Sequence, residues 1–152
     1  MKVAIGSDHA GFELKEKIKE FLQANGYHFE DFGAASDEST DYPEYAKKVS
    51  EAVLGGCEFG ILICASGIGM CIAANKFPGI RAAFCMNHAL AKAGREHNNA
   101  NVLTLASRFT TDIEAKKTVK AFLETKFGGE ERHVRRLKKL AELESIFQAR
   151  TG

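Results

Sequence analysis

The feature of this sequence that most constrains its fold is the regular alternation of short apolar runs with longer amphipathic segments. The apolar runs are typical of buried strands, and the amphipathic segments carry apolar residues at helical spacing. Strands are expected at residues 3–5, 27–32, 59–63, 80–84 and 102–105. Helices are expected at about 11–25, 43–54, 70–73, 87–96, 112–126 and 130–147.

Strands that alternate with helices favour repeated βαβ units, in which helices cover both faces of a parallel sheet. We therefore predict an α/β fold: a three-layer α/β/α sandwich around a five-stranded parallel sheet, Rossmann-like, plus a C-terminal helix. That last helix follows the completed sheet, so it is a candidate for packing on a second subunit. Its apolar side contains Val134, Leu137, Leu140, Leu143 and Phe147.

Composition narrows the class of protein. With 152 residues, 45% of them hydrophobic and 27% charged, we expect one globular domain over residues 1–152. The net charge of +1 is far below that of a general nucleic-acid binder, and no apolar run approaches the length of a membrane span. The four cysteines contain no C-x-x-C pair, which favours free thiols in a soluble cytoplasmic protein.

In a parallel sheet, ligands bind at the carboxyl ends of the strands, so the residues that follow each strand are candidates for a site. Asp8 and His9 follow the first strand. They could orient substrate hydroxyls or bind an anion or a metal. The alternative is that Asp8 caps the next helix and His9 is merely exposed.

The third strand leads into a glycine-bearing turn from Cys64 to Gly69. Glycines allow consecutive N–H groups to converge, and a helix follows, so the turn suits a phosphate or an oxyanion. The positive end of that helix would favour the thiolate of Cys64 as a base or nucleophile. The alternative for Cys64, and the preferred interpretation of Cys57, Cys71 and Cys85, is a small buried apolar residue.

Two further groups of polar residues stand out. His97, Asn98, Asn99 and Asn101 form a dense run at a helix end, which is either helix capping or part of a site. Arg108 follows the fifth strand, and Arg132 and Arg136 lie four residues apart on one face of the last helix. Arginine matches phosphate oxygens, although a solvated basic face is the alternative.

Taken together, these motifs resemble one family, the ribose-5-phosphate isomerases of type B, which group with galactose-6-phosphate isomerase subunits. The resemblance runs in order along nearly the whole chain. The stretches that carry it are Gly6–Gly11, Asp41–Pro43, Gly60–Cys64, Ser66–Met70, Ile72–Lys76, Gly79–Ala82, His97–Leu103 and Arg132–His133.

The resemblance implies interconversion of ribose 5-phosphate and ribulose 5-phosphate, a step of the pentose phosphate pathway, without metal or cofactor. It implies that Cys64 is the base that moves a proton between C2 and C1 through an enediolate, and that His97 is the acid that opens the furanose ring. It also implies a homodimer, or a tetramer built from it, with the active site shared between subunits. The implied anion hole and substrate contacts are Ala65, Ser66, Gly67, Ile68, Gly69, Asp8, His9, Asn98 and Arg108, with Arg132 and Arg136 on the phosphate.

The sequence departs from the family's usual pattern at two places. Relatives commonly have a glycine where this chain has Ala65, which would be strained if the position needs a positive φ. Glu130 and Glu131 stand between the Gly-Gly pair and Arg132, next to the implied phosphate clamp. Two other functions stay open: isomerisation of a hexose 6-phosphate such as allose or galactose 6-phosphate, and non-catalytic binding of a sugar phosphate.

Overall fold

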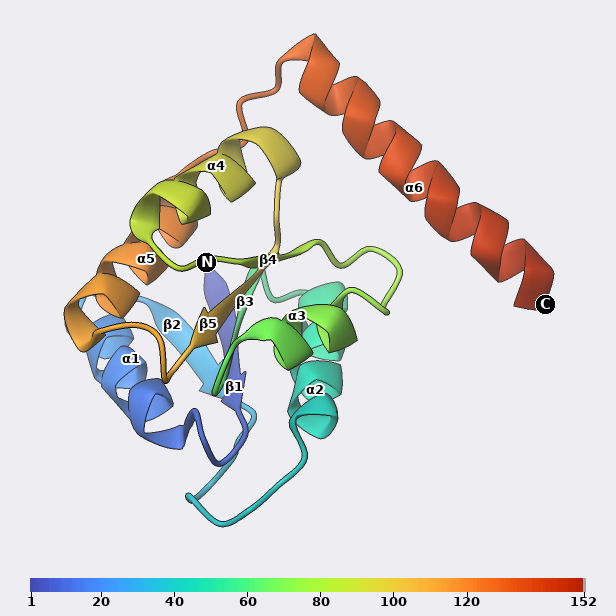
Figure 1. The fold of residues 1–152 in the computed structure, drawn as a ribbon. Helices are drawn as coiled ribbons and strands as arrows, with labels where there is room; N and C mark the ends of the chain where they lie inside the picture. The colour runs from blue at the N-terminus through green and yellow to red at the C-terminus, as the bar shows by residue number, and fades with distance from the viewer. Residues whose placement is uncertain (152) are drawn as a thin grey trace.

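A five-stranded parallel sheet forms the centre of the protein in the computed structural model, which describes the backbone of residues 1–151 and the side chains of residues 1–148 (Figure 1). The strands are β1 (Lys2–Ser7), β2 (His28–Asp31), β3 (Phe59–Cys64), β4 (Ala82–Phe84) and β5 (Val102–Ala106). Their order is β2-β1-β3-β5-β4, with every neighbouring pair parallel. The predicted α/β, Rossmann-like fold is confirmed, and the structure adds the strand order, which the sequence left open.

Helices cover both faces of the sheet. One apolar cluster joins the sheet to α1 (Phe12–Ala24), α4 (His88–Asn98) and α5 (Asp112–Glu124). A second joins its other face to α2 (Tyr42–Leu54) and α3 (Ile68–Ala74). None of the helices within residues 1–151 is both long and apolar enough to cross a lipid bilayer.

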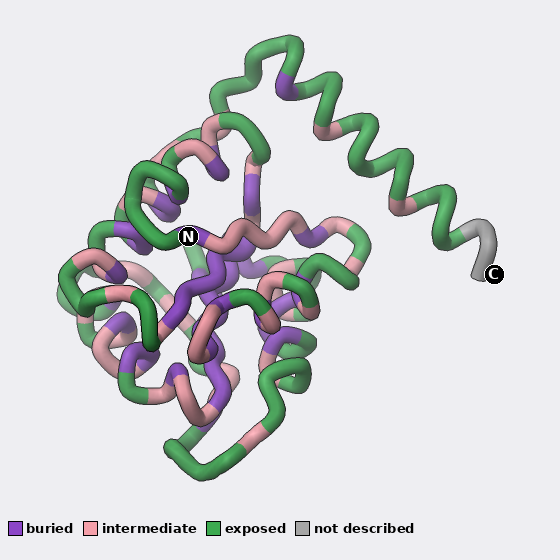
Figure 2. The backbone as a smooth tube through the Cα atoms, viewed as in Figure 1, coloured by how far each residue is buried: buried purple, intermediate pink, exposed green. Residues whose placement is uncertain are grey.

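The last helix, α6 (Glu131–Thr151), extends away from this sandwich (Figure 1). Buried residues gather along the strands, whereas nearly all of residues 131–148 in α6 are exposed (Figure 2). Its apolar residues are therefore largely uncovered, and five of them are at least 45% exposed: Val134, Leu140, Leu143, Ile146 and Phe147. The expected C-terminal helix is present, and it contributes little to the core of its own chain.

The sequence of β3 shows why the sheet is central. All six of its residues are buried, because helices pack on both sides of it. Ile61 and Ile63 face the cluster with α1 and α5, while Leu62 and Cys64 face α2 and α3. A strand that is apolar on both faces is the pattern expected for the middle of a covered parallel sheet.

The order in which strands are added to the sheet reverses at β1: β2 lies on one side of β1, and the later strands lie on the other, beginning with β3. The turn after β1 therefore lies against the end of β3. Gly11 lies so close that a Cβ added to it would stand 2.8 Å from the carbonyl carbon of Ile63. The Asp8 N–H donates to the Ile63 carbonyl at 3.3 Å. Such a switch point is where this class of fold binds ligands.

A buried ammonium group ties α1 to the end of β2. The Lys15 side chain is fully buried, and its Nζ lies 2.6 Å from Asp31 and 3.1 Å from Glu16. Burial alone would raise the pKa of Asp31, but hydrogen bonds from Lys15 and Lys19 lower it below its usual value. Asp31 also accepts the Gly33 N–H at 2.8 Å, so the ion pair fixes the chain where it leaves β2.

We expect Lys15→Met to lower the free energy of unfolding by about 1–3 kcal/mol at pH 7, because it leaves the half-buried Asp31 short of a hydrogen-bond donor. Lys19→Met, which removes the more exposed partner of Asp31, should cost about 1 kcal/mol or less. Urea denaturation measures both.

The loss in Lys15→Met should also depend on pH. The folded-state pKa of Asp31 lies below its unfolded value, so its stabilisation is present at neutral pH and disappears as the pH falls below about 4. The difference between wild type and Lys15→Met should shrink over that range. A difference that is the same at pH 7 and pH 3 would contradict this account of Lys15.

Candidate active site

The turn after β3 places a thiol among backbone N–H groups. Cys64 ends β3 and is 4% exposed, and its Sγ accepts the Gly67 N–H at 3.2 Å. The Ser66 Oγ accepts the Ile68 N–H at 3.3 Å. Among residues 1–148, no acceptor is present for the N–H groups of Gly69 and Met70 at the start of α3. The turn therefore offers free donors beside the thiol, which is an arrangement that can stabilise negative charge on oxygen.

Packing fixes the shape of this turn. Gly67 has φ +74°, and a Cβ at this position would lie 2.7 Å from the Phe84 ring and 3.0 Å from the Leu105 carbonyl carbon. The Tyr42 ring lies against Gly69 in the same way, 2.7 Å from where a Cβ would be. Ala65 is not among the described residues with positive φ, so its β-carbon introduces no backbone strain. The strain considered for this departure from the family pattern does not arise.

The residues after β1 and β5 lie beside the turn. Asp8 Oδ1 accepts the Gly11 N–H at 3.1 Å, so this buried carboxylate shapes the turn that leads into α1. Asp8 is not the N-cap of that helix, as its alternative interpretation had it: the N-cap is Gly11, and no side chain caps the helix. The Arg108 N–H donates to the Ala65 carbonyl at 3.0 Å, and the Ser107 N–H donates to the Cys64 carbonyl at 2.9 Å. Asp8 and Arg108 thus lie with the Cys64 turn at the carboxyl edge of the sheet.

His9 is anchored rather than merely exposed. Its Nδ1 lies 3.2 Å from both the N–H and the carbonyl oxygen of Thr40, and its own N–H donates to Thr40 Oγ1 at 3.2 Å. Thr40 offers Nδ1 either a donor or an acceptor, so the ring keeps its place whether Nδ1 carries a proton or not. The polar loop before α2 therefore holds His9 beside the site.

The other cysteines differ from Cys64 in their surroundings. Burial raises the pKa of Cys85 to about 12 and also raises the pKa of Cys57, so both thiols stay protonated. All four cysteines are free, and Cys71 is partly exposed on α3. Cys64 lies in the apolar cluster under α2 and α3, as its alternative interpretation expected, and it also accepts a hydrogen bond from the turn.

The remaining predicted residues form a second group around the end of α4 and the start of α6. The His97 ring stacks on His133, with 4.7 Å between ring centroids. Asn98 is held through its carbonyl, which accepts from Arg81 Nε at 3.1 Å. Asn99 ends α4 in the left-handed conformation, so it has the capping role considered for this polar run. Arg132 and Arg136 belong to the same group.

The group around the end of α4 and the start of α6 carries charged side chains and lies next to a hollow on the surface. Burial lowers the pKa of His133, and the charges of Arg132 and His97 act in the same direction. Arg132 Nη1 lies 2.6 Å from Glu130 Oε2. Arg136 forms no ion pair with any side chain of residues 1–148. A hollow of about 480 Å³ lies alongside, lined by Arg81, Asn98 and, from α6, Leu140, Leu143 and Glu144.

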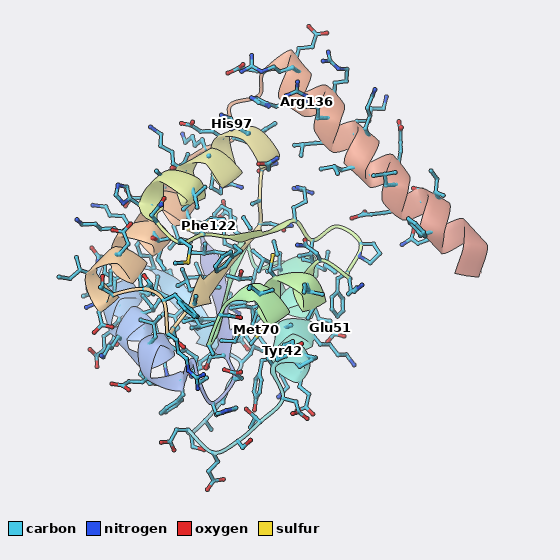
Figure 3. The ribbon with its side chains drawn as sticks, in the orientation of Figure 1. Tyr42, Glu51, Met70, His97, Phe122 and Arg136 are labelled. Carbon is cyan, nitrogen blue, oxygen red and sulfur yellow. The ribbon has the colours of Figure 1, made fainter. Side chains whose placement is uncertain are left out.

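The two groups lie at opposite ends of the strands: the group with Cys64 at their carboxyl ends and the group with His97 at their amino ends. Gly60 pairs with Val102 and Cys64 with Ala106, so the chain just after His97 and Asn98 enters the sheet four residues before Cys64 leaves it. At about 3.3 Å per residue, the separation along the strands is roughly 13 Å. Figure 3 shows His97 and Arg136 in the upper part of the molecule and Met70 and Tyr42 in its lower half. One chain therefore does not bring Cys64 and His97 to the same atoms.

Sequence reasoning did not select three residues that the structure places at these two groups: Tyr42, Thr40 and His133. Tyr42 belongs to a stretch that carried the family resemblance, and that was its signal. His133 stands next to Arg132, but nothing local predicts its stacking on His97. Among the residues whose side chains are described, no three His, Cys, Asp or Glu groups come together as a metal site would require.

Comparison with known proteins gives consistent similarities over nearly the whole chain. A family model described as Ribose/Galactose Isomerase matches residues 3–140. Ribose-5-phosphate isomerase B of Escherichia coli K12 is 44% identical over 144 residues, which cover 94% of this chain and 96% of that one.

Solved structures agree. Ribose-5-phosphate isomerase B of Clostridium thermocellum superposes with a TM-score of 0.95 at 47% identity, covering 97% of this chain and 99% of that one. The Mycoplasma genitalium enzyme of the same name, crystallised with bound ribulose 5-phosphate, gives a TM-score of 0.89 at 41% identity, with 95% and 96% covered.

The packing of the Cys64 turn yields a stability prediction. We expect Gly67→Ala to lower the free energy of unfolding by about 2–4 kcal/mol, since it adds a clash with Phe84 and Leu105 to the cost of a left-handed alanine. Gly26→Ala is a matched control: its φ is +76°, and nothing lies within 4 Å of an added Cβ. It should cost only about 1–2 kcal/mol. Equal losses in the two variants, measured by urea denaturation, would show that the contacts with Phe84 and Leu105 contribute nothing.

Proposed function

The chain belongs to the ribose/galactose isomerase family, and we propose that it interconverts ribose 5-phosphate and ribulose 5-phosphate with Cys64 as the base. The observation that carries this proposal is the turn at Cys64. It combines a buried thiol, a backbone N–H that donates a hydrogen bond to the sulfur, and free N–H groups at the switch point of the sheet. Relatives named ribose-5-phosphate isomerase B match nearly the whole chain, which supports the same activity.

The chemistry requires a base and a stabiliser of negative charge. The Cys64 thiolate removes the proton from C2 of the open-chain aldose. The C2–H electron pair forms a C1=C2 double bond while the carbonyl π pair moves onto O1, which gives an enediolate. The proton then returns to C1 while O2 becomes the ketone oxygen, with a hydroxyl proton passing from O2 to O1. The free N–H groups of Gly69 and Met70, with the Ser66 hydroxyl, face the charge that develops on oxygen.

We further propose that each active site combines two copies of the chain in a homodimer. Opening the furanose ring needs an acid near the ring oxygen, and in the same chain His97 precedes β5, whose first residue lies about 13 Å from Cys64 along the strands. In a two-fold symmetric dimer, His97 of the partner subunit can face Cys64, and the reverse contact forms a second, equivalent site. Asn98, Arg132 and Arg136 would come from the same partner as the acid.

Exposed apolar surface at both groups supports this arrangement. Ile68 and Ile72 of α3, next to the Cys64 turn, are 53% and 57% exposed. The uncovered side of α6 lies beside the second group. Apolar patches of this kind are normally buried against another protein surface. A second copy that covers them would also bring the two groups together.

The substrate's phosphate would bind to Arg132 and Arg136, whose guanidinium groups match phosphate oxygens. His9 and Asp8 would contact the sugar from the other chain, and the Tyr42 ring would form a wall of the site beside Gly69. We propose that residues 1–152 act as one catalytic domain. The free thiols fit a reducing, cytoplasmic compartment.

Cys64→Ala tests the proposed base. We expect turnover of ribose 5-phosphate by wild type to persist with a chelator present, and to fall at least about 100-fold in this variant. Cys57→Ala removes another buried thiol and should retain turnover. The assay monitors the formation of ribulose 5-phosphate, with allose 6-phosphate run in parallel as the competing substrate. Unchanged turnover in Cys64→Ala would refute the proposed mechanism.

Mixing two inactive variants tests the shared site. Cys64→Ala and His97→Ala should each be nearly inactive alone. After unfolding and refolding together in equal amounts, half of the dimers are mixed, and each mixed dimer has one intact site, so about a quarter of wild-type activity should return. Two Cys64→Ala preparations treated in the same way are the control. No recovery in a sample shown to contain mixed dimers would place both residues in one chain's site.

A further inference from the structure

The side chain of Glu130 forms an ion pair with Arg132, one of the two arginines of the proposed phosphate clamp. Glu130 immediately precedes α6, and its carbonyl accepts the N–H groups of His133 at 2.9 Å and Val134 at 3.0 Å. Its backbone is therefore fixed by the first turn of the helix. From that position its carboxylate reaches Arg132, with 2.6 Å between Oε2 and Nη1.

The neighbouring charges do not share this contact. Glu131, the next residue, forms no ion pair among residues 1–148, and neither does Arg136, one helical turn beyond Arg132. The contact is therefore specific to one acid and one arginine. Both side chains are 55% exposed, so the carboxylate can swing into solvent without leaving a buried charge behind.

We propose that Glu130 is an internal competitor for the phosphate: its carboxylate holds Arg132 until a phosphate displaces it, and so lowers the affinity for phosphorylated ligands. This inference rests on the phosphate-clamp role of Arg132 in the proposed function. Carboxylate and phosphate oxygens use the same guanidinium N–H groups, so the two anions cannot both take the Nη1 donor in full. The displaced carboxylate also stays close enough to repel a phosphate dianion.

The competition would also affect selectivity. A phosphate dianion carries more charge and more acceptor oxygens than a carboxylate, so it can displace Glu130 from Arg132. A ligand that carries only a carboxylate would exchange one carboxylate for another on Arg132 and gain no binding energy there. A ligand without an anion would not displace Glu130 at all. Glu130 would thus weaken binding of all anions, and would make Arg132 respond chiefly to the more strongly charged ones.

Glu130→Gln, with Glu131→Gln as its matched control, tests the proposal. We expect the KM for ribose 5-phosphate to fall about 3- to 10-fold in Glu130→Gln, with kcat within about two-fold of wild type. The Kd of inorganic phosphate, measured by titration calorimetry, should fall by a similar factor. Glu131→Gln should change each value by less than about two-fold, because its charge does not contact the arginine.

A double-mutant cycle isolates the contact. In an Arg132→Ala background, Glu130→Gln should lose most of its effect on phosphate binding, because the contested donor is gone. Three results would each overturn the proposal: an unchanged Kd in Glu130→Gln, an equal fall in Glu131→Gln, or a full effect without Arg132. Failure of every variant to bind phosphate would also overturn it.

The calorimetric titration does not depend on turnover, which separates this proposal from the proposed function. If wild type fails to isomerise ribose 5-phosphate, the proposed function is wrong, and the phosphate titration still decides whether Glu130 competes for Arg132. If turnover is present and Glu130→Gln binds phosphate as wild type does, the isomerase proposal stands and the competitor does not.

Discussion

The close approach of the first turn to the end of β3 is the contact on which the rest of the site depends. Gly11 packs directly on the Ile63 carbonyl group, and Asp8 hydrogen-bonds to the same carbonyl oxygen. This contact exists because the strand order reverses between β1 and β3, which puts two strand-to-helix turns side by side. A side chain at residue 11 would separate them, so the geometry around Cys64 rests on a glycine that carries no chemical group of its own.

The length of the strands sets the second constraint. A parallel sheet places the carboxyl ends of all its strands on one side, and the carboxyl ends of β3 and β5 lie about 13 Å from the start of β5, where the chain arrives from α4. The polar run at the end of α4 and the thiol at the end of β3 therefore lie at opposite ends of the strands. In the proposed reaction a phosphorylated sugar has to meet both an acid and a base. Because one chain holds these two groups apart, the geometry favours a site formed by the thiol of one copy and the polar run of another.

The alternation of apolar and amphipathic segments was sufficient to predict the sheet, the helices on both faces and the extra C-terminal helix, because each signal is local. Cys64, Asp8, His9 and Arg108 were also predictable as neighbours, since the rule for strand ends needs only the order of elements. The separation of His97 from Cys64 depends on strand register, and the stacking of His133 on His97 depends on tertiary packing. Neither is encoded in a short motif.

The departures from the family pattern show the same division between local and distant effects. The backbone strain considered for Ala65 depends on its own φ, and that φ is not positive. The effect of Glu130 depends on which group its carboxylate contacts, and although exposed it lies 2.6 Å from Arg132 Nη1. An added acid beside a phosphate-binding arginine need not shift the backbone or the helix to matter, because it acts through the donor that it occupies. The affinity of such a clamp is therefore set by the charges around the arginines as well as by the arginines themselves.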